Sequence, residues 1–563
     1  MDFKEQIAKQ LSKSVNMDFN SIYEMIEVPK DYKMGDYALP CFKLSRVLKS
    51  APDKIAKELS QNIDKGEYIE KVEQLNGYLN FFLDREKFTL SVLEEIQSKN
   101  EAYGSSNEGN GKTICIDYSS INIAKPFHIG HLLTTVIGNA LYNIYSFLGY
   151  KCVSINHLGD WGTQFGKLIY AYKHWGSKQS VEKGGVNELT RLYVKFHDCA
   201  KEDESLEDEA RAWFKKIEEK DEEAIELFSW FKEITLKEVS RVYDILGIKF
   251  DSYAGESFYN DKMQTVIDEL REKNLLELSQ GAYVVNLDEY KLPPCLILKK
   301  DGATLYSTRD LAAAFYRKKE YNFYKCLYVV AYQQNLHFKQ WFKVVEKLGY
   351  DWAKDLEHVA FGMVSLEDGT LSTRKGKVVL LEDVLNKAIE KTKQIIEEKN
   401  PDISNKEKVS SQVGVGAVIF NALLNNRIKD MVFSWDRALN FDGETGPYVQ
   451  YTHARCNSVI KKAGEIKQKG DYYSLDNDEA FIVLKMLYSF PRTVAEAKEK
   501  NEPSLITRYS VDLSQAFNKY YYEHRIIDED EKGTANRVLL TKCVKTVIKT
   551  ALKLIGIEAP DQM

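Results

Sequence analysis

Residues 113–155 constrain the fold most strongly, because two apolar runs flank one helical pattern there. The first run, 113–118, reads TICIDY, a helical pattern follows over 131–148, and a second run, CVSIN, covers 152–156. Gly149 stands just past the helical pattern, where helices commonly end. Strand, helix and strand in this order predict a βαβ unit, and therefore a parallel sheet covered by helices.

Strand-like runs return further along the chain. They occupy residues 283–286, 294–298 and 326–330 and alternate with helical stretches. We expect them to form the second half of the same sheet, since strands separated by helices commonly pair in parallel. Between the two halves, about residues 187–246 are long, charged and periodic at helical spacing, which predicts a helical insertion.

Two further domains are predicted to flank the parallel α/β domain. With 563 residues, the chain is long enough for about three or four domains. Residues 1–105 combine helical patterns with an alternating run at 78–83, which predicts a small α/β domain. A stretch rich in Gly, Ser and Asn at 104–112 separates it from the parallel-sheet domain, which we place at 106–386. Residues 387–563 are almost entirely helical in pattern and predict an all-α domain.

The composition argues against several classes of protein. Asp and Glu total 84 and Lys and Arg total 78, so the formal net charge is −6 and a generally basic nucleic-acid coat is disfavoured. The eight cysteines are scattered without a C-x-x-C pair, so we expect reduced thiols and no zinc. No apolar run approaches the roughly 18 residues that span a bilayer, and the N-terminus lacks the pattern of a signal peptide. We therefore expect a cytoplasmic protein with no membrane partner.

The turn after the first strand of the βαβ unit carries a candidate phosphate site. His128, Gly130 and His131 lie where a helix begins beyond the carboxyl end of a strand, and Lys125 is close by. Free amides at a helix N-terminus favour an anion, a glycine admits close backbone approach, and histidine rings donate hydrogen bonds to phosphate oxygens. Two nearby histidines are more often core or surface groups, but the strand-to-helix position favours the phosphate site.

A second candidate phosphate-binding segment lies far downstream. Residues 369–377 read GTLSTRKGK, a glycine-flanked stretch with three cations. Such a loop suits closure over a triphosphate and stabilisation of a departing pyrophosphate. Taken alone, a basic surface loop is an equally good interpretation.

Both segments resemble the signature motifs of class I aminoacyl-tRNA synthetases. Residues 128–131 match their H-I-G-H motif in every letter, and the downstream loop is similar to K-M-S-K-S in the variant form S-T-R-K-G. In this variant the two lysine positions of the common motif fall on Thr370 and Thr373. The resemblance implies a Rossmann-type catalytic domain that uses ATP with Mg²⁺. It implies catalytic roles for His128, Gly130, His131, Lys125, Arg374 and Lys375, and ATP contacts from His128, Ile129, Gly130, His131, Ser372, Thr373, Arg374 and Lys375.

Runs spread over nearly the whole chain resemble the arginyl-tRNA synthetases in particular. They cover residues 35–38, 76–80, 117–131, 156–166, 369–377, 441–455 and 556–563. The resemblance implies an arginine–tRNA ligase whose partners are L-arginine and tRNA(Arg), with an all-α C-terminal domain that binds the anticodon. Two positions depart from the family pattern: Ile121 stands where proline is common, and Leu133 where arginine is common.

The arginine-binding residues follow partly from chemistry and partly from the resemblance. A planar guanidinium group prefers carboxylates that accept paired N–H donors. By resemblance, a Y-x-x-x-D segment supplies a tyrosine and an aspartate that face the substrate side chain. The implied set is Asp117, Ser119, Asn122, Tyr306, Asp310 and Gln334. Each residue alone could be a cap, turn or surface group, but their occurrence together with both ATP motifs favours binding.

Contacts with tRNA rest on weaker patterns. The resemblance implies that Asn76, Tyr78 and Asn80 of the first domain meet the tRNA elbow. Tyr520 lies in a segment rich in tyrosine and basic residues, whose rings could stack on unpaired anticodon bases. Aromatic residues on helices are more often core residues, so the core remains the competing interpretation for Tyr520.

The implied reaction is attack of the arginine carboxylate on the α-phosphate of ATP, followed by transfer of arginine to the 3′ end of tRNA. We expect a monomer, and the resemblance implies that bound tRNA precedes arginine activation. Two alternatives remain open. A small-molecule nucleotidyltransferase also uses an H-x-G-H turn but does not need a large helical C-terminal domain. A non-catalytic tRNA-binding paralogue is disfavoured by the retained histidines and loop cations.

Overall fold

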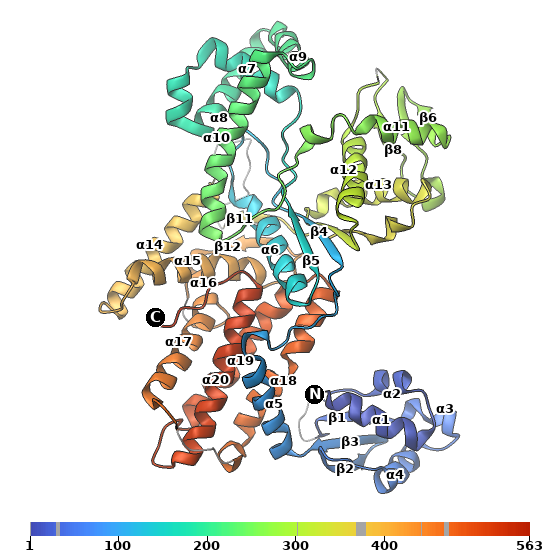
Figure 1. Cartoon of the computed structure of the whole chain (residues 1–563), viewed down its shortest axis with the longest axis vertical. Coiled ribbons are helices and arrows are strands. Elements are labelled where there is room, and N and C mark those ends of the chain that lie inside the picture. Colours follow the sequence, from blue (N-terminus) through green and yellow to red (C-terminus); the bar gives the residue numbers. More distant parts are fainter. Residues whose placement is uncertain (1, 30–33, 301, 367–378, 441, 467–471) are drawn as a thin grey trace. The chain divides into compact units, whose positions relative to one another are not determined.

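The computed structural model describes residues 2–29, 34–300, 302–366, 379–440, 442–466 and 472–563 (Figure 1). The chain divides into two units. Unit 1 comprises Met1–Tyr103, Cys456–Ser489 and Gln515–Val547, and unit 2 comprises Gly104–Arg455, Phe490–Ser514 and Ile548–Met563. The C-terminal helices therefore contribute to both units.

Unit 1 contains a three-stranded antiparallel sheet in the order β1-β3-β2. Its strands are β1 (Tyr37–Pro40), β2 (Ile69–Leu75) and β3 (Tyr78–Leu83). Leu79 and Phe81 are fully buried, as the alternating pattern of 78–83 predicts, and the expected strand is confirmed. The helices of this part are α1 (Phe3–Val15), α2 (Phe19–Met25), α3 (Ser45–Leu48), α4 (Pro52–Asn62) and α5 (Arg85–Lys99).

The first domain and the C-terminal helices share one core within unit 1. Phe88 of α5 packs against Phe481 and Tyr488 of α18 (Asp478–Glu499), with ring centroids 5.4 and 5.5 Å apart. Phe3 of α1 joins the same cluster at 5.3 Å from Phe88. Because buried aromatic rings carry a large apolar area, this cluster joins the N-terminal region to α18.

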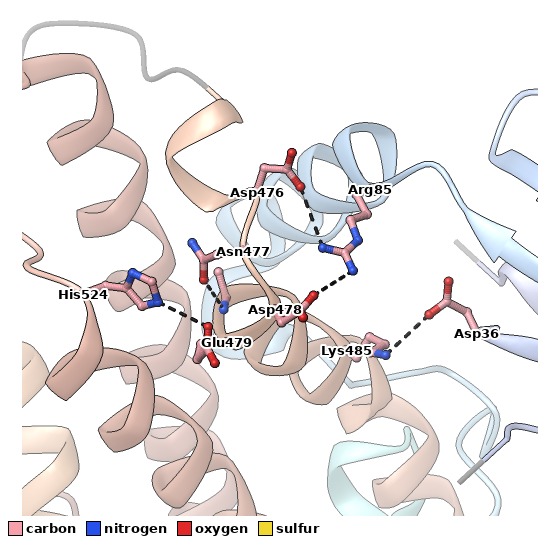
Figure 2. A network of polar contacts seen from close by, with 9 residues as sticks. Asp36, Arg85, Asp476, Asn477, Asp478, Glu479, Lys485 and His524 are labelled. Carbon is pink, nitrogen blue, oxygen red and sulfur yellow. Dashed lines mark hydrogen bonds and ion pairs between the residues drawn. The ribbon is translucent and has the colours of Figure 1, made fainter. Parts of the chain in front are cut away.

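A network of polar contacts lies at the start of α18 (Figure 2). Arg85 of α5 forms ion pairs with Asp476, at 3.8 Å, and with Asp478, at 2.9 Å, at the start of α18. Lys485 of the same helix lies 3.4 Å from Asp36. The side chains of the two Arg85 pairs are 35–53% exposed, so these pairs contribute little to stability, whereas the Asp36 carboxylate is only 10% exposed.

Unit 2 is built on a four-stranded parallel sheet in the order β10-β9-β4-β5. The predicted βαβ unit is confirmed as β4 (Thr113–Asp117), α6 (Leu132–Phe147) and β5 (Lys151–Ile155). The run 326–330 is confirmed as β9 (Lys325–Tyr328), and β10 (Leu356–His358) forms the far edge.

Four helices form the predicted insertion. They are α7 (Thr163–Trp175), α8 (Lys178–Glu202), α9 (Ser205–Glu218) and α10 (Glu222–Leu246), and α7 packs against α8 and α9 (Figure 1). The helical segment begins at Thr163, earlier than the predicted start near 187. Gly185, with a φ of 53°, breaks α8 and interrupts the helical period at that point. The predicted end at 246 agrees with α10, which Gly247 terminates at a φ of 67°.

Two runs expected in the parallel sheet lie elsewhere, so that expectation is wrong for them. Residues 283–286 and 294–298 fall on β7 (Ala282–Val285) and β8 (Cys295–Leu298), which form a separate antiparallel sheet with β6 (Leu276–Ser279). Gln280 and Gly281 have φ values of 50° and 80°. Two successive positive φ values make the tight turn of a hairpin, which forces β6 and β7 into antiparallel pairing.

The remaining elements of the described chain are mainly helical, as predicted for the C-terminal region. Helices α11 (Met263–Glu272), α12 (Tyr306–Tyr321) and α13 (Asn335–Lys347) precede it. They are followed by α14 (Leu381–Lys399), α15 (Lys406–Leu423), α16 (Trp435–Ala438), α17 (Gly446–Ala463), α18, α19 (Ser504–Glu523) and α20 (Glu531–Leu554). Strands β11 (Val364–Leu366) and β12 (Met431–Phe433) pair in parallel. Among the described residues, none of these helices is long and apolar enough to cross a membrane.

Candidate active site

The carboxyl ends of the parallel strands meet at one edge of the central sheet. The chain passes from β4 to its neighbour β5 through α6, but reaches its other neighbour, β9, only after the insertion. In such sheets, ligands bind beyond the strand ends at the point where the strand order reverses. Asp117, the last residue of β4, pairs with Ile155 of β5 and Tyr328 of β9 and marks this point.

The loop that leaves β4 has an unusual backbone. Ser119, Ser120 and Ala124 have φ values of 69°, 44° and 58°, in the left-handed region that non-glycine residues seldom adopt. Helix α10 holds the loop in place: the Ser119 hydroxyl lies 2.7 Å from the Tyr243 hydroxyl, and the Ala124 amide donates to the Thr235 hydroxyl at 3.0 Å. Strain fixed by surrounding contacts is typical of functional loops.

The two histidines stand directly before α6, in the short 3-10 helix η4 (Ile129–His131) and at its N-cap. The Gly130 amide donates to Nδ1 of His128 at 3.1 Å, and the two imidazole rings are 4.1 Å apart. Burial lowers the pKa of His128, and burial together with the neighbouring His128 and Lys125 lowers the pKa of His131 to about 3. Both rings are therefore neutral near pH 7. Because Nδ1 of His128 accepts a hydrogen bond, its proton resides on Nε2, which can donate to a phosphate oxygen.

The segment after the basic loop is attached to the histidine turn. The Ile129 amide donates to the Val379 carbonyl at 3.0 Å, and the Leu381 amide donates to the Phe127 carbonyl at 3.0 Å. On the other side of the basic loop, β11 lies against η4. Ser372, Thr373, Arg374 and Lys375 lie outside the described residues, but the described segments on both sides of them meet the predicted ATP site.

Helix α12 carries two residues of the predicted arginine-binding set, Tyr306 and Asp310. Tyr306 lies in its first turn and is 69% exposed. Asp310 lies one turn further, and its Oδ2 is 2.5 Å from Nε2 of His337 on α13, within hydrogen-bond distance. The side chains of both partners remain about one quarter exposed, so Asp310 is accessible to a ligand.

Two more residues of the predicted arginine-binding set, Asn122 and Gln334, also lie at the strand ends. Asn122 is exposed and pairs through its backbone with Gly159, in the loop after β5. A Cβ on Gly159 would lie 2.4 Å from Oδ1 of Asn122, so a larger residue there would force the Asn122 side chain to move. Gln334 is exposed in the 3-10 helix η7 (Tyr332–Gln334), just after β9.

Glu256 belongs to the same region and was not predicted from the sequence. It begins the 3-10 helix η5 (Glu256–Tyr259), and burial raises the pKa of its carboxyl to about 7, with Arg309 opposing and Asp160 and Asp310 adding to the shift. Asp160, fully buried, holds this segment: it accepts the Ser257 amide at 2.9 Å and the ammonium of Lys232 at 2.6 Å. A lone glutamate outside any periodic pattern gives no sequence signal.

Two predicted arginine-binding side chains are already engaged within the protein. Asp117 is 5% exposed and forms an ion pair with Arg317 of α12 at 2.7 Å. The hydroxyl of Ser119, which is 2% exposed, lies 2.9 Å from that of Thr135 as well as near Tyr243. These partners enclose the Ser119 hydroxyl, so of this residue only the backbone is left for the predicted contact with arginine.

The predicted tRNA contacts in unit 1 divide into exposed and buried residues. Asn76 is exposed in the turn between β2 and β3, and Tyr78 is half-buried. Asn80 is only 3% exposed and Tyr520 is fully buried. Both side chains are therefore covered by the protein itself and offer no surface to RNA in this structure. On the same helix as Tyr520, the exposed rings are Tyr521, at 38%, and Tyr522, at 91%.

Comparison with known proteins agrees with this arrangement. The family described as "tRNA synthetases class I (R), catalytic domain" matches residues 92–435, the "Arginyl tRNA synthetase N terminal domain" matches 1–83, and the "DALR anticodon binding domain" matches 449–563. Two similar curated proteins are the arginine–tRNA ligases of Alkaliphilus metalliredigens and Halothermothrix orenii, each 55% identical, with 100% of both chains covered.

Two solved structures share the fold. The arginyl-tRNA synthetase of Thermus thermophilus aligns over 100% of both chains with a TM-score of 0.83 and 22% identity. That of Plasmodium falciparum aligns over 99% of both chains with a TM-score of 0.79 and 24% identity. The sequence identities at full length and the match over the catalytic region lead to one conclusion: this chain belongs to the class I arginyl-tRNA synthetases.

Proposed function

We propose that this chain is an arginine–tRNA ligase, which activates L-arginine with ATP and transfers it to the 3′ end of tRNA(Arg). The name carried by its 55% identical full-length relatives supports this assignment. The structural observation that supports it best is the attachment of Val379 and Leu381, which follow the basic loop, to the histidine turn before α6.

The ATP phosphates bind at the N-terminus of η4 and α6. His128 and His131 donate hydrogen bonds from neutral rings, and Gly130, which has no side chain, leaves room for the phosphates beside the turn. Lys125, exposed beside the turn, adds a positive charge. Ser372, Thr373, Arg374 and Lys375 close over the β- and γ-phosphates, and Mg²⁺ enters bound to these phosphates, since it prefers phosphate oxygens and water as ligands.

The arginine side chain is bound beside α12. Asp310 and Glu256 accept the N–H groups of the guanidinium, and Tyr306 covers its face. Near pH 7 the protonated and the ionised form of the Glu256 carboxyl are about equally populated, because burial raises its pKa to about 7. The positive guanidinium of a bound arginine favours the ionised form of Glu256, and this form binds the guanidinium more strongly. Asn122 and Gln334 hold the polar groups at the other end of the amino acid.

The reaction then proceeds in two displacements. The arginine carboxylate oxygen attacks the α-phosphorus in line, a new P–O bond forms, and the bond to the β-phosphate oxygen breaks, releasing pyrophosphate. A hydroxyl of the terminal adenosine of tRNA next attacks the arginyl carbonyl carbon and displaces AMP. The neutral histidines stabilise charge that develops on the phosphate and do not act as nucleophiles.

The tRNA is held by unit 1. Asn76 and Tyr78 meet the elbow. Tyr521 and Tyr522 replace Tyr520 as the rings that stack on anticodon bases, because they are exposed on the same helix, whereas Tyr520 is buried. The enzyme acts as a monomer in the cytoplasm, where its tRNA substrate is charged.

Pyrophosphate exchange tests the proposal. Labelled pyrophosphate is incubated with ATP and each amino acid in turn, with and without bulk tRNA, for the wild type and Asp310→Ala. Exchange with arginine alone, dependent on tRNA and lost in the variant, is the expected result. Exchange with another amino acid contradicts the pocket, and tight tRNA binding without any exchange indicates a non-catalytic paralogue.

A further inference from the structure

A buried ion pair stands at the centre of the candidate active site. The guanidinium of Arg317, 1% exposed on α12, lies 2.7 Å from Oδ2 of Asp117 at the end of β4. The other carboxylate oxygen, Oδ1, accepts the hydroxyl of Ser120 at 2.8 Å. Both oxygens of Asp117 are therefore used inside the protein.

The surroundings of Arg317 hold it in this place. Its guanidinium carbon lies 5.4 Å from the centre of the Tyr328 ring, within the range of a cation–π contact. Nη2 also lies 3.4 Å from Nδ1 of His157, in the loop after β5. The side chain thus connects α12 with the ends of β4, β5 and β9, and an incoming guanidinium cannot displace it without leaving a buried charge unpaired.

Asp310 offers a contrast on the same helix. It precedes Arg317 by about two helical turns, so the two side chains lie on one face of α12. The Asp310 carboxylate is 27% exposed and has His337 as its partner, whereas Asp117 is enclosed. One carboxylate on this side of the sheet is therefore open to a ligand, and the other is occupied by an arginine of the protein itself.

We propose that Arg317 is a positioning residue whose guanidinium pairs permanently with Asp117. The guanidinium of the substrate therefore binds to Asp310 and Glu256 and not to Asp117. Through Asp117 and its contact with Ser120, the pair fixes the strained loop that leads from β4 to the histidine turn. This inference rests on the proposed arginine–tRNA ligase activity and changes the role expected for Asp117.

The test uses a neutral replacement of the whole pair. Arg317→Met alone leaves the buried Asp117 carboxylate without its ion-pair partner and can prevent folding. Asp117→Asn combined with Arg317→Met removes both charges of the pair. The matched control is Asp528→Asn with Arg537→Met, which removes another Arg–Asp pair of 2.7 Å, with Arg537 9% exposed, in unit 1. Arg317→Lys retains the charge.

Two readouts separate positioning from recognition. The first is the preference for arginine over citrulline, which has nearly the same shape but no side-chain charge, measured by calorimetry with the full chain. The second is kcat of pyrophosphate exchange in the presence of tRNA. In the double variant at positions 117 and 317, we expect the preference to stay within about threefold of wild type and kcat to fall about tenfold or more. Arg317→Lys should recover part of kcat, and the control pair should change neither quantity.

Two results would overturn the inference. If the double variant loses its preference for arginine to the extent that Asp310→Asn does, by about 30-fold or more, Asp117 reads the substrate guanidinium. If kcat and preference are both unchanged, the pair has no positioning role. A wild-type protein with no preference for arginine over citrulline is a different result, which contradicts the proposed function itself.

Discussion

The amide of Ile129 donates a hydrogen bond to the carbonyl of Val379 at 3.0 Å, and this contact joins two segments about 250 residues apart in the chain. Ile129 lies between the two histidines before α6, and Val379 is the first described residue after the basic loop. Because the bond is made by backbone atoms, it does not depend on the side chains of Ile129 and Val379. The described segment after the basic loop is thereby attached to the histidine turn.

The first prediction concerns the neutral histidines. His131→Asn should lower kcat of pyrophosphate exchange by about 10²–10³ while the KM for arginine changes little, because the ring stabilises charge that develops only in the transition state. His174→Asn, an exposed histidine on α7, serves as the control and should behave as wild type. An equal loss in both variants would contradict the assigned role.

The second prediction concerns the pH dependence of arginine binding. Glu256 has a pKa raised to about 7, so it is largely protonated at pH 6 and largely charged at pH 8. Only the charged form attracts a guanidinium strongly, so the KM for arginine should fall by up to about tenfold as pH rises from 6 to 8. In Glu256→Gln this dependence should be flat and the KM uniformly high. A variant that keeps the wild-type slope would show that another group titrates.

The third prediction concerns the buried carboxylate that holds the Glu256 segment. Lys232→Met removes the ammonium 2.6 Å from Asp160, whose side chain is fully buried, and should destabilise unit 2 by about 2–3 kcal/mol. The KM for arginine should also rise, because Ser257, next to Glu256, is bonded to the same carboxylate. Lys237→Met, an exposed position on the same helix, is the control. Urea unfolding and exchange kinetics measure both effects, and equal stability of the two variants would contradict the prediction.

The fourth prediction contrasts two contacts at the junction shown in Figure 2. Arg85→Ala removes the ion pairs with Asp476 and Asp478, in which the side chains are 35–53% exposed. It should lower the free energy of unfolding by less than about 1 kcal/mol. Phe88→Ala, in the aromatic cluster of unit 1, should lower the free energy of unfolding by about 3–5 kcal/mol, because it leaves a cavity between α5 and α18. Thermal unfolding compares them directly, and a larger loss in Arg85→Ala would reverse the ranking.

The parts of the fold that could be predicted are those with a strong local pattern. The runs around Ile116 and Val153 with the helix between them could form only a βαβ unit, and the structure confirms it. The strands at 283–286 and 294–298 were assigned to the wrong sheet, because a short apolar run predicts a strand without naming its partner. The hairpin turn at Gln280–Gly281 was the local signal that could have corrected the assignment.

The residues of the candidate site likewise divide into those that the sequence could predict and those that it could not. The histidine motif could be found because its letters are contiguous, and its geometry suits phosphate binding. The burial of the Tyr520 ring and of the Ser119 hydroxyl could not be predicted, because a sequence does not show which face of a helix or loop is covered. The partner of Asp117 could not be found either, since Arg317 lies 200 residues away and becomes its neighbour only through the pairing of β4 with β9 and the packing of α12.

The most direct measurement is the formation of arginyl-tRNA itself. Labelled arginine, ATP, Mg²⁺ and tRNA are incubated with the full chain, and label is counted in acid-precipitated RNA. The structure and the family predict label that requires ATP, that is released by mild base as expected for an ester, and that is lost in Asp310→Ala. Label absent from RNA although tRNA and ATP both bind would contradict the assignment of this chain as an arginine–tRNA ligase.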